Sequence, residues 1–216
     1  MGADGTMTTN HDVTPQGDPA PRASNWNLPN ALTALRIVMV PFFVWFLVAG
    51  GTHGEDSMAM RWAAVVTFGL AMLTDKLDGD IARARNLITS FGKIADPIAD
   101  KLLTGAAFVV LSMLGELWWW VTIVILVREW GITVMRFVVI RYGVMAASKG
   151  GKTKTVLQTA ALIALLLPLA PFVGQWWLWL AWLLTALALL ATVVTGVDYV
   201  VKAVQLRNRA VRGEGE

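Results

Sequence analysis

Six apolar stretches, each close to the length of a membrane-crossing helix, constrain the fold of this chain more than any other feature. They run approximately over residues 32–48, 58–77, 94–114, 117–140, 156–173 and 178–201. An α-helix rises 1.5 Å per residue, so about 20 apolar residues cross the roughly 30 Å of hydrocarbon in a bilayer. Only 15% of the residues are charged, which is too few for an ordinary soluble domain. The sequence therefore predicts an all-α integral membrane bundle of six transmembrane helices.

The two ends of the chain differ from this apolar region. Residues 1–27 are polar, contain Pro and Gly and show no apolar periodicity, so we expect a flexible cytoplasmic tail. This segment has neither the basic start nor the prompt apolar run of a signal peptide. We expect residues 28–205 to form the membrane domain, and residues 206–216, with their three arginines, to be a basic tail that anchors at the membrane surface.

The positive charges predict an orientation. Six crossings put both termini on one side, and every one of the 18 Lys and Arg except Arg61 falls toward that side. Positive loops stay cytoplasmic, so both termini should face the cytoplasm and the protein should lie in the cytoplasmic membrane. The Trp residues at 118–120 and at 176, 177, 179 and 182 then fall together at the opposite interface. Their alternative role is simply to pack helices together.

Five aspartates interrupt the second and third stretches, within the segment TDKLDGDIARARNLITSFGKIADPIAD. Asp75 and Asp78 are three residues apart, and Asp96 and Asp100 are four apart, so each pair lies on one face of a helix. Four carboxylates gathered at membrane depth need cations to compensate them. The chain has no Cys, and oxygen ligands alone favour Mg²⁺ or Mn²⁺ over Zn²⁺. The fifth, Asp80, belongs to neither pair and is interpreted as a surface or supporting residue.

Small and basic residues accompany the first aspartate pair. Gly79 and Ala82 leave room for a substrate beside the backbone, while Arg83 and Arg85 supply cations for phosphate oxygens. This combination suggests a metal-bound diphosphate. Gly92 is expected to interrupt the chain before the next helix, with Pro97 in that helix's first turn. In the alternative interpretation the aspartates only pair with basic residues of a solvated loop, namely Lys76, Arg83, Arg85, Lys93 and Lys101.

The spacing resembles the signature of the CDP-alcohol phosphotransferases, D-x2-D-G-x2-A-R-x8-G-x3-D-x3-D, with every fixed position filled. The resemblance implies a six-helix membrane fold, usually homodimeric, that transfers a phosphatidyl or related group from a CDP-linked donor to a hydroxyl and releases CMP. It also implies that two divalent ions are held by Asp75, Asp78, Asp96 and Asp100. The CDP part of the donor would be bound by Asp78, Gly79, Ala82 and Arg83. Asp100 would also be the catalytic base.

Further motifs narrow the resemblance to one branch of the family. They are PN-x-LT-x2-R at 29–36, DP-x-ADK at 96–101, RE-x6-R at 128–136 and GK-x-KT-x2-Q at 151–158. Together these motifs look like those of bacterial phosphatidylglycerophosphate synthases, and the likeness covers roughly residues 28–160. It implies CDP-diacylglycerol as donor and glycerol 3-phosphate as acceptor, in phospholipid biosynthesis.

The basic residues of the second half fit an acceptor that carries a phosphate. Arg128 and Arg136 are eight apart and so lie near one face of a helix, and three lysines follow at positions 149, 152 and 154. Five cations close to a carboxylate site suit a phosphorylated acceptor. The alternative for Lys149, Lys152 and Lys154 is a role in topology and in contact with anionic headgroups. Glu129 is expected to pair with a neighbouring Arg.

Other functions remain open at this point. Within the family, the acceptor could be inositol phosphate or, as in cardiolipin synthase, phosphatidylglycerol. A membrane prenyltransferase also places Asp pairs around Mg²⁺ and a diphosphate, and a divalent-cation transporter could line its path with aspartates. Nothing in the sequence indicates a nucleic-acid partner.

Overall fold

The structure, a computed structural model, describes residues 28–84, 90–139 and 149–213. Within these ranges the side chains at 28–29, 78–80, 82–84, 90–96, 136–139, 149–150, 207 and 209–212 are not described. The described ranges are helical and contain no strand. The long helices are α1 (Leu28–Gly50), α2 (Met58–Ala84), α3 (Ser90–Met113), α4 (Trp119–Val139), α5 (Lys149–Leu166) and α7 (Trp176–Arg212); the short ones are η1 (Thr52–Gly54) and α6 (Ala170–Val173). The predicted all-α fold is therefore confirmed.

Each predicted apolar stretch corresponds to one of the long helices, but the limits differ in places: the fourth stretch was expected from residue 117, whereas α4 begins at Trp119. The fifth stretch was expected to continue to residue 173, whereas α5 ends at Leu166 and α6 follows separately. Pro168 accounts for this difference, because a proline cannot donate its backbone nitrogen and disfavours helix at the residue before it. The expectations for Gly92 and Pro97 were also wrong. Gly92 was expected before the helix but lies inside α3, and Pro97 was expected in its first turn but lies in the second.

Two of these helices are long and apolar enough to cross a membrane by length and composition alone. Within the described residues they cover Asn30–Gly50 and Trp176–Leu206. The other long helices carry charged residues along part of their length, such as Asp75 and Lys76 in α2 or Arg128 and Glu129 in α4. The number of crossings is therefore not established by hydropathy.

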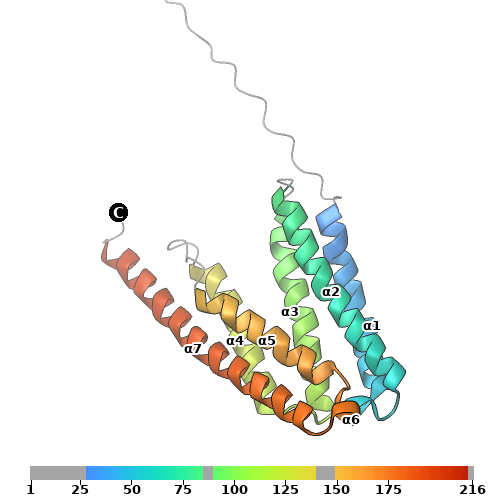
Figure 1. Cartoon of the computed structure of the whole chain (residues 1–216). Coiled ribbons are helices and arrows are strands. Elements are labelled where there is room, and N and C mark those ends of the chain that lie inside the picture. The colour runs from blue at the N-terminus through green and yellow to red at the C-terminus, as the bar shows by residue number, and fades with distance from the viewer. Residues whose placement is uncertain (1–27, 85–89, 140–148, 214–216) are drawn as a thin grey trace, which may run out of the picture.

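The long helices form two neighbouring groups, which meet where α3 packs against α4 and where α5 packs against α2 and α3. Helix α1 packs against α2 and α3, while α7 packs against α4 and α5 (Figure 1). The first residues of α1 and the last residues of α7 lie at the same end of the molecule, which we call the terminal end. The opposite end carries η1, the turn between α3 and α4, and α6, and we call it the turn end.

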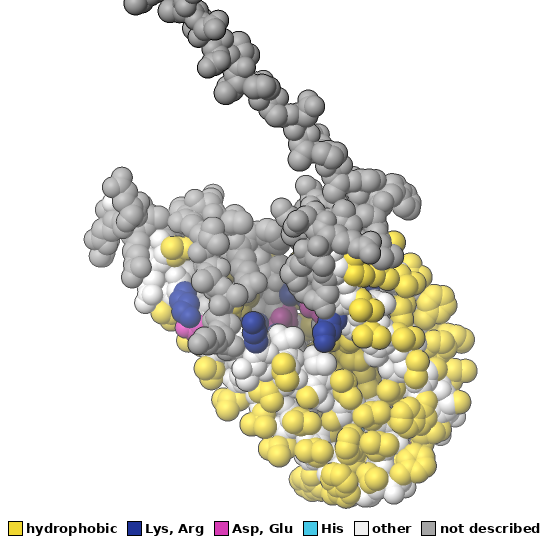
Figure 2. Space-filling model, turned by 45° about the horizontal axis from the view of Figure 1, so that its top comes forward, with side chains coloured by type: hydrophobic (Ala, Val, Ile, Leu, Met, Phe, Trp, Pro, Cys, Tyr) yellow, Lys and Arg dark blue, Asp and Glu magenta, His cyan; other side chains and the backbone are white. Residues whose placement is uncertain are grey.

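The core between the helices is apolar, and so is much of the outside. Phe43, Phe68, Phe108 and Leu162 are fully or almost fully buried, and the rings of Phe43 and Phe68 lie 5.6 Å apart. Large apolar side chains also cover most of the visible flank away from the terminal end (Figure 2). An exposed apolar surface of this extent is unusual for a soluble monomer and suits a lipid environment.

Tryptophans of two distant segments meet at the turn end. The ring centroids of Trp118 and Trp182 lie 4.8 Å apart, and those of Trp118 and Trp120 lie 6.2 Å apart. Trp118 and Trp179 are more than half exposed. One tryptophan also packs helices, since Trp177 donates its indole N–H to the carbonyl of Ala164 at 3.0 Å. The expected meeting of the two Trp segments is confirmed.

A buried ion pair joins four segments at the turn end. The guanidinium of Arg61, at the start of α2, donates to both carboxylate oxygens of Glu116 at 2.7 and 2.6 Å. It also donates to the carbonyls of Gly51, Leu165 and Leu166 at 2.9–3.2 Å. All five N–H donors of the guanidinium are thus used. Arg61, the one cation that the charge pattern left on this side, is therefore a structural residue.

The segment before α2 packs closely against this ion pair. A Cβ atom on Gly50 would lie 2.9 Å from the backbone nitrogen of Arg61, so only glycine fits there without movement. His53 adopts φ 52°, and its backbone N–H donates to Glu116 at 3.0 Å while its Nδ1 lies 3.2 Å from the same carboxylate. His53 therefore contributes to the binding of a buried carboxylate.

Candidate active site

A cavity of about 600 Å³ opens between the helices toward the terminal end. Its lining comes from five helices: Met72 of α2, Asp100 of α3, Arg128 of α4, Lys154 of α5 and Tyr199 of α7 are among the residues. Figure 2 shows basic and acidic side chains gathered around a hollow at this end, against the apolar flank. Charged side chains of α3, α4 and α5 are therefore concentrated around this cavity.

The helices carry the aspartates where the spacing predicted them. Asp75 and Asp78 lie in α2, Asp96 and Asp100 lie in α3, and α2 packs against α3. The side chains of Asp78 and Asp96 lie outside the described residues, as does that of Asp80. Among the described side chains no group of three or more His, Cys, Asp or Glu is close enough to hold a metal ion. The four-carboxylate cluster therefore stays a prediction.

Asp100 and Asp75 have different surroundings. Asp100 lines the cavity, and Lys101, Arg36 and Lys154 are close enough to act on it electrostatically. Asp75 is 38% exposed, and its Oδ1 lies 2.7 Å from an amino nitrogen of the fully buried Arg36. Arg36 comes from α1, so this helix contributes a cation to the aspartate region. The PN-x-LT-x2-R motif contained this residue, but its partner could not be identified from the spacing.

The proposed donor-binding residues follow Asp75 along α2. Asp78, Gly79, Ala82 and Arg83 lie in the last two turns of this helix, toward the terminal end. Their side chains lie outside the described residues. Their location on the helix that carries Asp75 agrees with the expected arrangement, and their roles remain predictions.

Three of the five proposed acceptor-binding cations line the cavity. These are Arg128 of α4 and Lys152 and Lys154 of α5. The other two, Arg136 and Lys149, belong to the same two helices, and their side chains lie outside the described residues. The structure thus brings together cations that are 24–26 residues apart in sequence.

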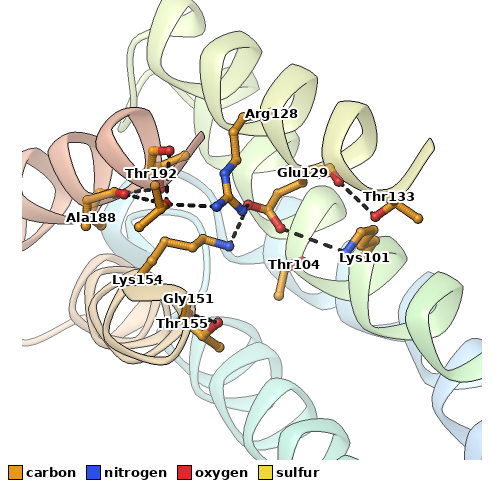
Figure 3. Close-up of polar contacts among 12 residues, drawn as sticks. Lys101, Thr104, Arg128, Glu129, Thr133, Gly151, Lys154, Thr155, Ala188 and Thr192 are labelled. Carbon is orange, nitrogen blue, oxygen red and sulfur yellow. Dashed lines mark hydrogen bonds and ion pairs between the residues drawn. The ribbon is translucent and has the colours of Figure 1, made fainter. Parts of the chain in front are cut away.

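Glu129 lies among these cations and pairs with a neighbouring arginine, as expected. Its Oε1 accepts from Arg128 at 2.9 Å and from Lys154 at 2.5 Å (Figure 3). Its Oε2 lies 3.9 Å from Nζ of Lys101, which comes from α3. The sequence predicted the contact with Arg128 but neither of the two lysine contacts.

Arg128 is held in place by α7 as well. Its second amino group donates to Oγ1 of Thr195 at 2.8 Å, and its guanidinium carbon lies 5.9 Å from the ring centroid of Tyr199. Its Nε is buried and has no hydrogen-bond partner among the described residues. Thr195 and Tyr199 could not be predicted as parts of the site, because no motif connects α7 with it. Their polar side chains on an otherwise apolar helix were the one indication in the sequence.

Fold and site together define a helical protein whose ionic cavity is lined by carboxylates and basic side chains. The model of one protein family, described as CDP-alcohol phosphatidyltransferase, matches residues 26–187. The chain belongs to this family, and it is accordingly a membrane-bound transferase.

Named relatives agree with this assignment. The chain is 48% identical over 189 residues to the probable phosphatidylglycerophosphate synthase of Mycobacterium tuberculosis (strain ATCC 25618 / H37Rv), covering 88% of this chain and 87% of the relative. It is 40% identical to the CDP-diacylglycerol–glycerol-3-phosphate 3-phosphatidyltransferase of Bacillus subtilis (strain 168), over 68% of this chain and 80% of that protein. A protein of the same name from Escherichia coli (strain K12) is 35% identical over 65% of this chain and 77% of the relative.

Proposed function

We propose that this protein transfers the phosphatidyl group of CDP-diacylglycerol to sn-glycerol 3-phosphate, giving phosphatidylglycerophosphate and CMP. The observation that carries the proposal is the cavity itself, in which Asp100 and the cations Lys101, Arg128 and Lys154 converge from three helices. The names of the relatives describe the same donor and acceptor. A phosphate on the acceptor explains why a site beside the reacting hydroxyl carries so many positive charges.

We also propose that the four aspartates hold two divalent ions, Mg²⁺ or Mn²⁺. Of the four proposed ligands, Asp75 is partly exposed and Asp100 lines the cavity, so both can present hard oxygen donors to an ion. Asp78 and Asp96 would complete the set from the same helices. When bound, such ions neutralise the diphosphate and stabilise the leaving CMP.

Asp100 is the proposed base. The acceptor oxygen forms a bond to the phosphatidyl phosphorus, the bond from that phosphorus to the CMP oxygen breaks, and the hydroxyl proton passes to Asp100. A carboxylate surrounded by cations is a weak base, so its contribution depends on its position beside the hydroxyl. Its location at the cavity wall, next to Lys101, supports this role.

The donor and the acceptor would bind to different helices. The CDP part would lie along the end of α2, against Asp78, Gly79, Ala82 and Arg83. The acceptor phosphate would lie on the α4 and α5 side, where Arg128, Lys152 and Lys154 line the cavity and where Arg136 and Lys149 would complete the set. Substrate hydroxyl and phosphorus would then meet near Asp100, between the two groups of helices.

We further propose that all six long helices cross the bilayer, with the termini and the cavity on the cytoplasmic side of the cell membrane. The common location of the start of α1 and the end of α7 supports an even number of crossings. The residue limits of the tails and a homodimeric state are part of the same proposal. In this arrangement the water-soluble acceptor reaches the site from the cytoplasm, and the lipid donor reaches it from the bilayer.

An acceptor panel tests the proposed reaction. The purified protein, CDP-diacylglycerol labelled in its phosphatidyl group and either metal ion would be incubated separately with glycerol 3-phosphate, inositol phosphate and phosphatidylglycerol. We expect labelled phosphatidylglycerophosphate with glycerol 3-phosphate alone. A labelled product with one of the other acceptors instead would assign the chain to another branch of the family. Release of pyrophosphate in place of CMP, or metal flux without nucleotide, would exclude the family reaction.

A further inference from the structure

Three helices each direct one basic side chain at the same carboxylate. Lys101 extends from α3, Arg128 from α4 and Lys154 from α5, and all three surround Glu129 (Figure 3). The four side chains are only 6–16% exposed. Like charges repel strongly where water is largely excluded, so three cations cannot stay together here without an anion.

Glu129 is well placed to be that anion. Its Oε1 is shared by Arg128 and Lys154, and its Oε2 faces Lys101 at a distance that allows charge attraction but no hydrogen bond. Glu129 is itself fixed, because Arg128 is bound to Thr195 of α7 at 2.8 Å. A chain of contacts therefore runs from α7 through Arg128 and Glu129 to the lysines of α5 and α3.

The lysines keep donors for a ligand. An ammonium group has three N–H donors, and Lys154 needs one of them for Glu129. Lys154, Lys101 and Glu129 all line the cavity, together with Thr155 and the buried Gln158. A phosphate entering the cavity would therefore meet ammonium groups that already point inward, and little further ordering of these long side chains would be needed.

We propose that Glu129 is a positioning residue for the acceptor phosphate: it holds Lys101, Arg128 and Lys154 in the cavity in the arrangement that binds the phosphate group. The inference rests on the proposed function and adds a residue that does not itself touch the substrate. The negative charge of Glu129 repels the phosphate to some extent. This repulsion is outweighed because Glu129 keeps two flexible lysine side chains in the orientation that binds the phosphate. Without Glu129 the two lysines would turn toward water, and the site would lose its preformed geometry.

The test compares Glu129→Gln, which keeps the shape and removes the charge, with Glu129→Asp, which keeps the charge. Asp198→Asn is the matched control, since it makes the same carboxylate-to-amide change in a half-exposed pair with Lys202 outside the cavity. We expect Glu129→Gln to raise the KM for glycerol 3-phosphate about tenfold or more, the size of one lost charge-assisted contact. The KM for CDP-diacylglycerol should stay within about twofold, and Glu129→Asp should restore part of the loss.

A binding measurement separates this inference from the proposed function. Inorganic phosphate would be titrated calorimetrically into the purified full-length protein in EDTA, so that metal ions do not contribute. A dissociation constant about tenfold higher for Glu129→Gln than for wild type would support the positioning role even if glycerol 3-phosphate proved not to be the acceptor. Unchanged phosphate binding and an unchanged acceptor KM would overturn the inference. Equal increases in both KM values, with a lower melting temperature, would also overturn it, because they indicate a purely structural role.

Discussion

Removing the charge of Glu116 should destabilise the protein without altering its cavity. Glu116 and Arg61 are both fully buried, and the replacement Glu116→Gln leaves the guanidinium without a counter-charge. Removing one partner of a buried ion pair lowers the free energy of unfolding by about 3–5 kcal/mol. The carbonyls of Gly51, Leu165 and Leu166 still accept from Arg61 and partly solvate its charge. We therefore expect a loss at the lower limit, about 3 kcal/mol.

The assay is thermal unfolding of the purified protein in detergent, followed by the fluorescence of its 11 tryptophans. For a chain of this size about 1 kcal/mol shifts the melting temperature by roughly 2–4 °C, so Glu116→Gln should lower it by about 6–12 °C. Asp198→Asn, which breaks an exposed pair, should lower it by no more than about 2 °C. A melting temperature for Glu116→Gln as high as that of this control would show that the buried pair contributes little to stability.

The double replacement Arg61→Met with Glu116→Leu adds a second check on the same argument. Buried ion pairs can often be exchanged for apolar residues at little cost. Here the exchange should still destabilise, because three backbone carbonyls and the backbone N–H of His53 lose their partners. A double variant as stable as wild type would show that these backbone groups find other partners.

Three further predictions concern acid stability, packing and catalysis, and a fourth concerns the acceptor. Burial tends to raise the pKa of Glu116, but hydrogen bonds from His53 and Arg61 outweigh it and hold the pKa below its usual 4.5. The stability that Glu116 contributes is therefore full above about pH 4.5 and is lost as the pH falls further, so the melting difference between wild type and Glu116→Gln should shrink in acid and stay constant near neutrality. Gly50→Ala should cost about 1–3 kcal/mol, measured by the same unfolding assay, because its methyl group would lie 2.9 Å from a backbone nitrogen. Asp100→Asn should lower kcat by about 10²–10⁴ and affect CDP-diacylglycerol binding much less, because the other three aspartates would still hold the ions, and substantial remaining turnover would exclude Asp100 as the base. Lys154→Met should raise the KM for glycerol 3-phosphate by about 10–100-fold, and an equal increase for the donor would count against an acceptor role.

The helices could be predicted from the sequence because each apolar stretch is long and has few internal breaks. The ends of these helices could not be predicted equally well. Hydropathy continued the fifth stretch past Pro168, whereas the backbone chemistry of proline ends α5 at Leu166. Hydropathy also does not decide how many helices cross the membrane, since among the described residues only α1 and α7 contain a segment long and apolar enough to cross by length and composition.

The aspartate pairs could be identified because their spacing is local and helical. The contacts that organise the cavity are not local, so the spacing could not reveal them. Arg36 reaches Asp75 from 39 residues away in sequence, and Arg128 reaches Thr195 across 67 residues. The charge pattern likewise left Arg61 as an isolated cation, because its partner Glu116 lies 55 residues further along the chain. Such pairs are decided by how helices pack, which a single sequence does not specify.

The most direct test of the proposed reaction measures CMP release by the purified protein from CDP-diacylglycerol, with Mg²⁺ or Mn²⁺ and with or without glycerol 3-phosphate. We expect CMP to appear only when glycerol 3-phosphate is present, with one phosphatidylglycerophosphate formed for each CMP. CMP release that does not depend on glycerol 3-phosphate, or no CMP release when both substrates and the metal ion are supplied, would exclude this reaction.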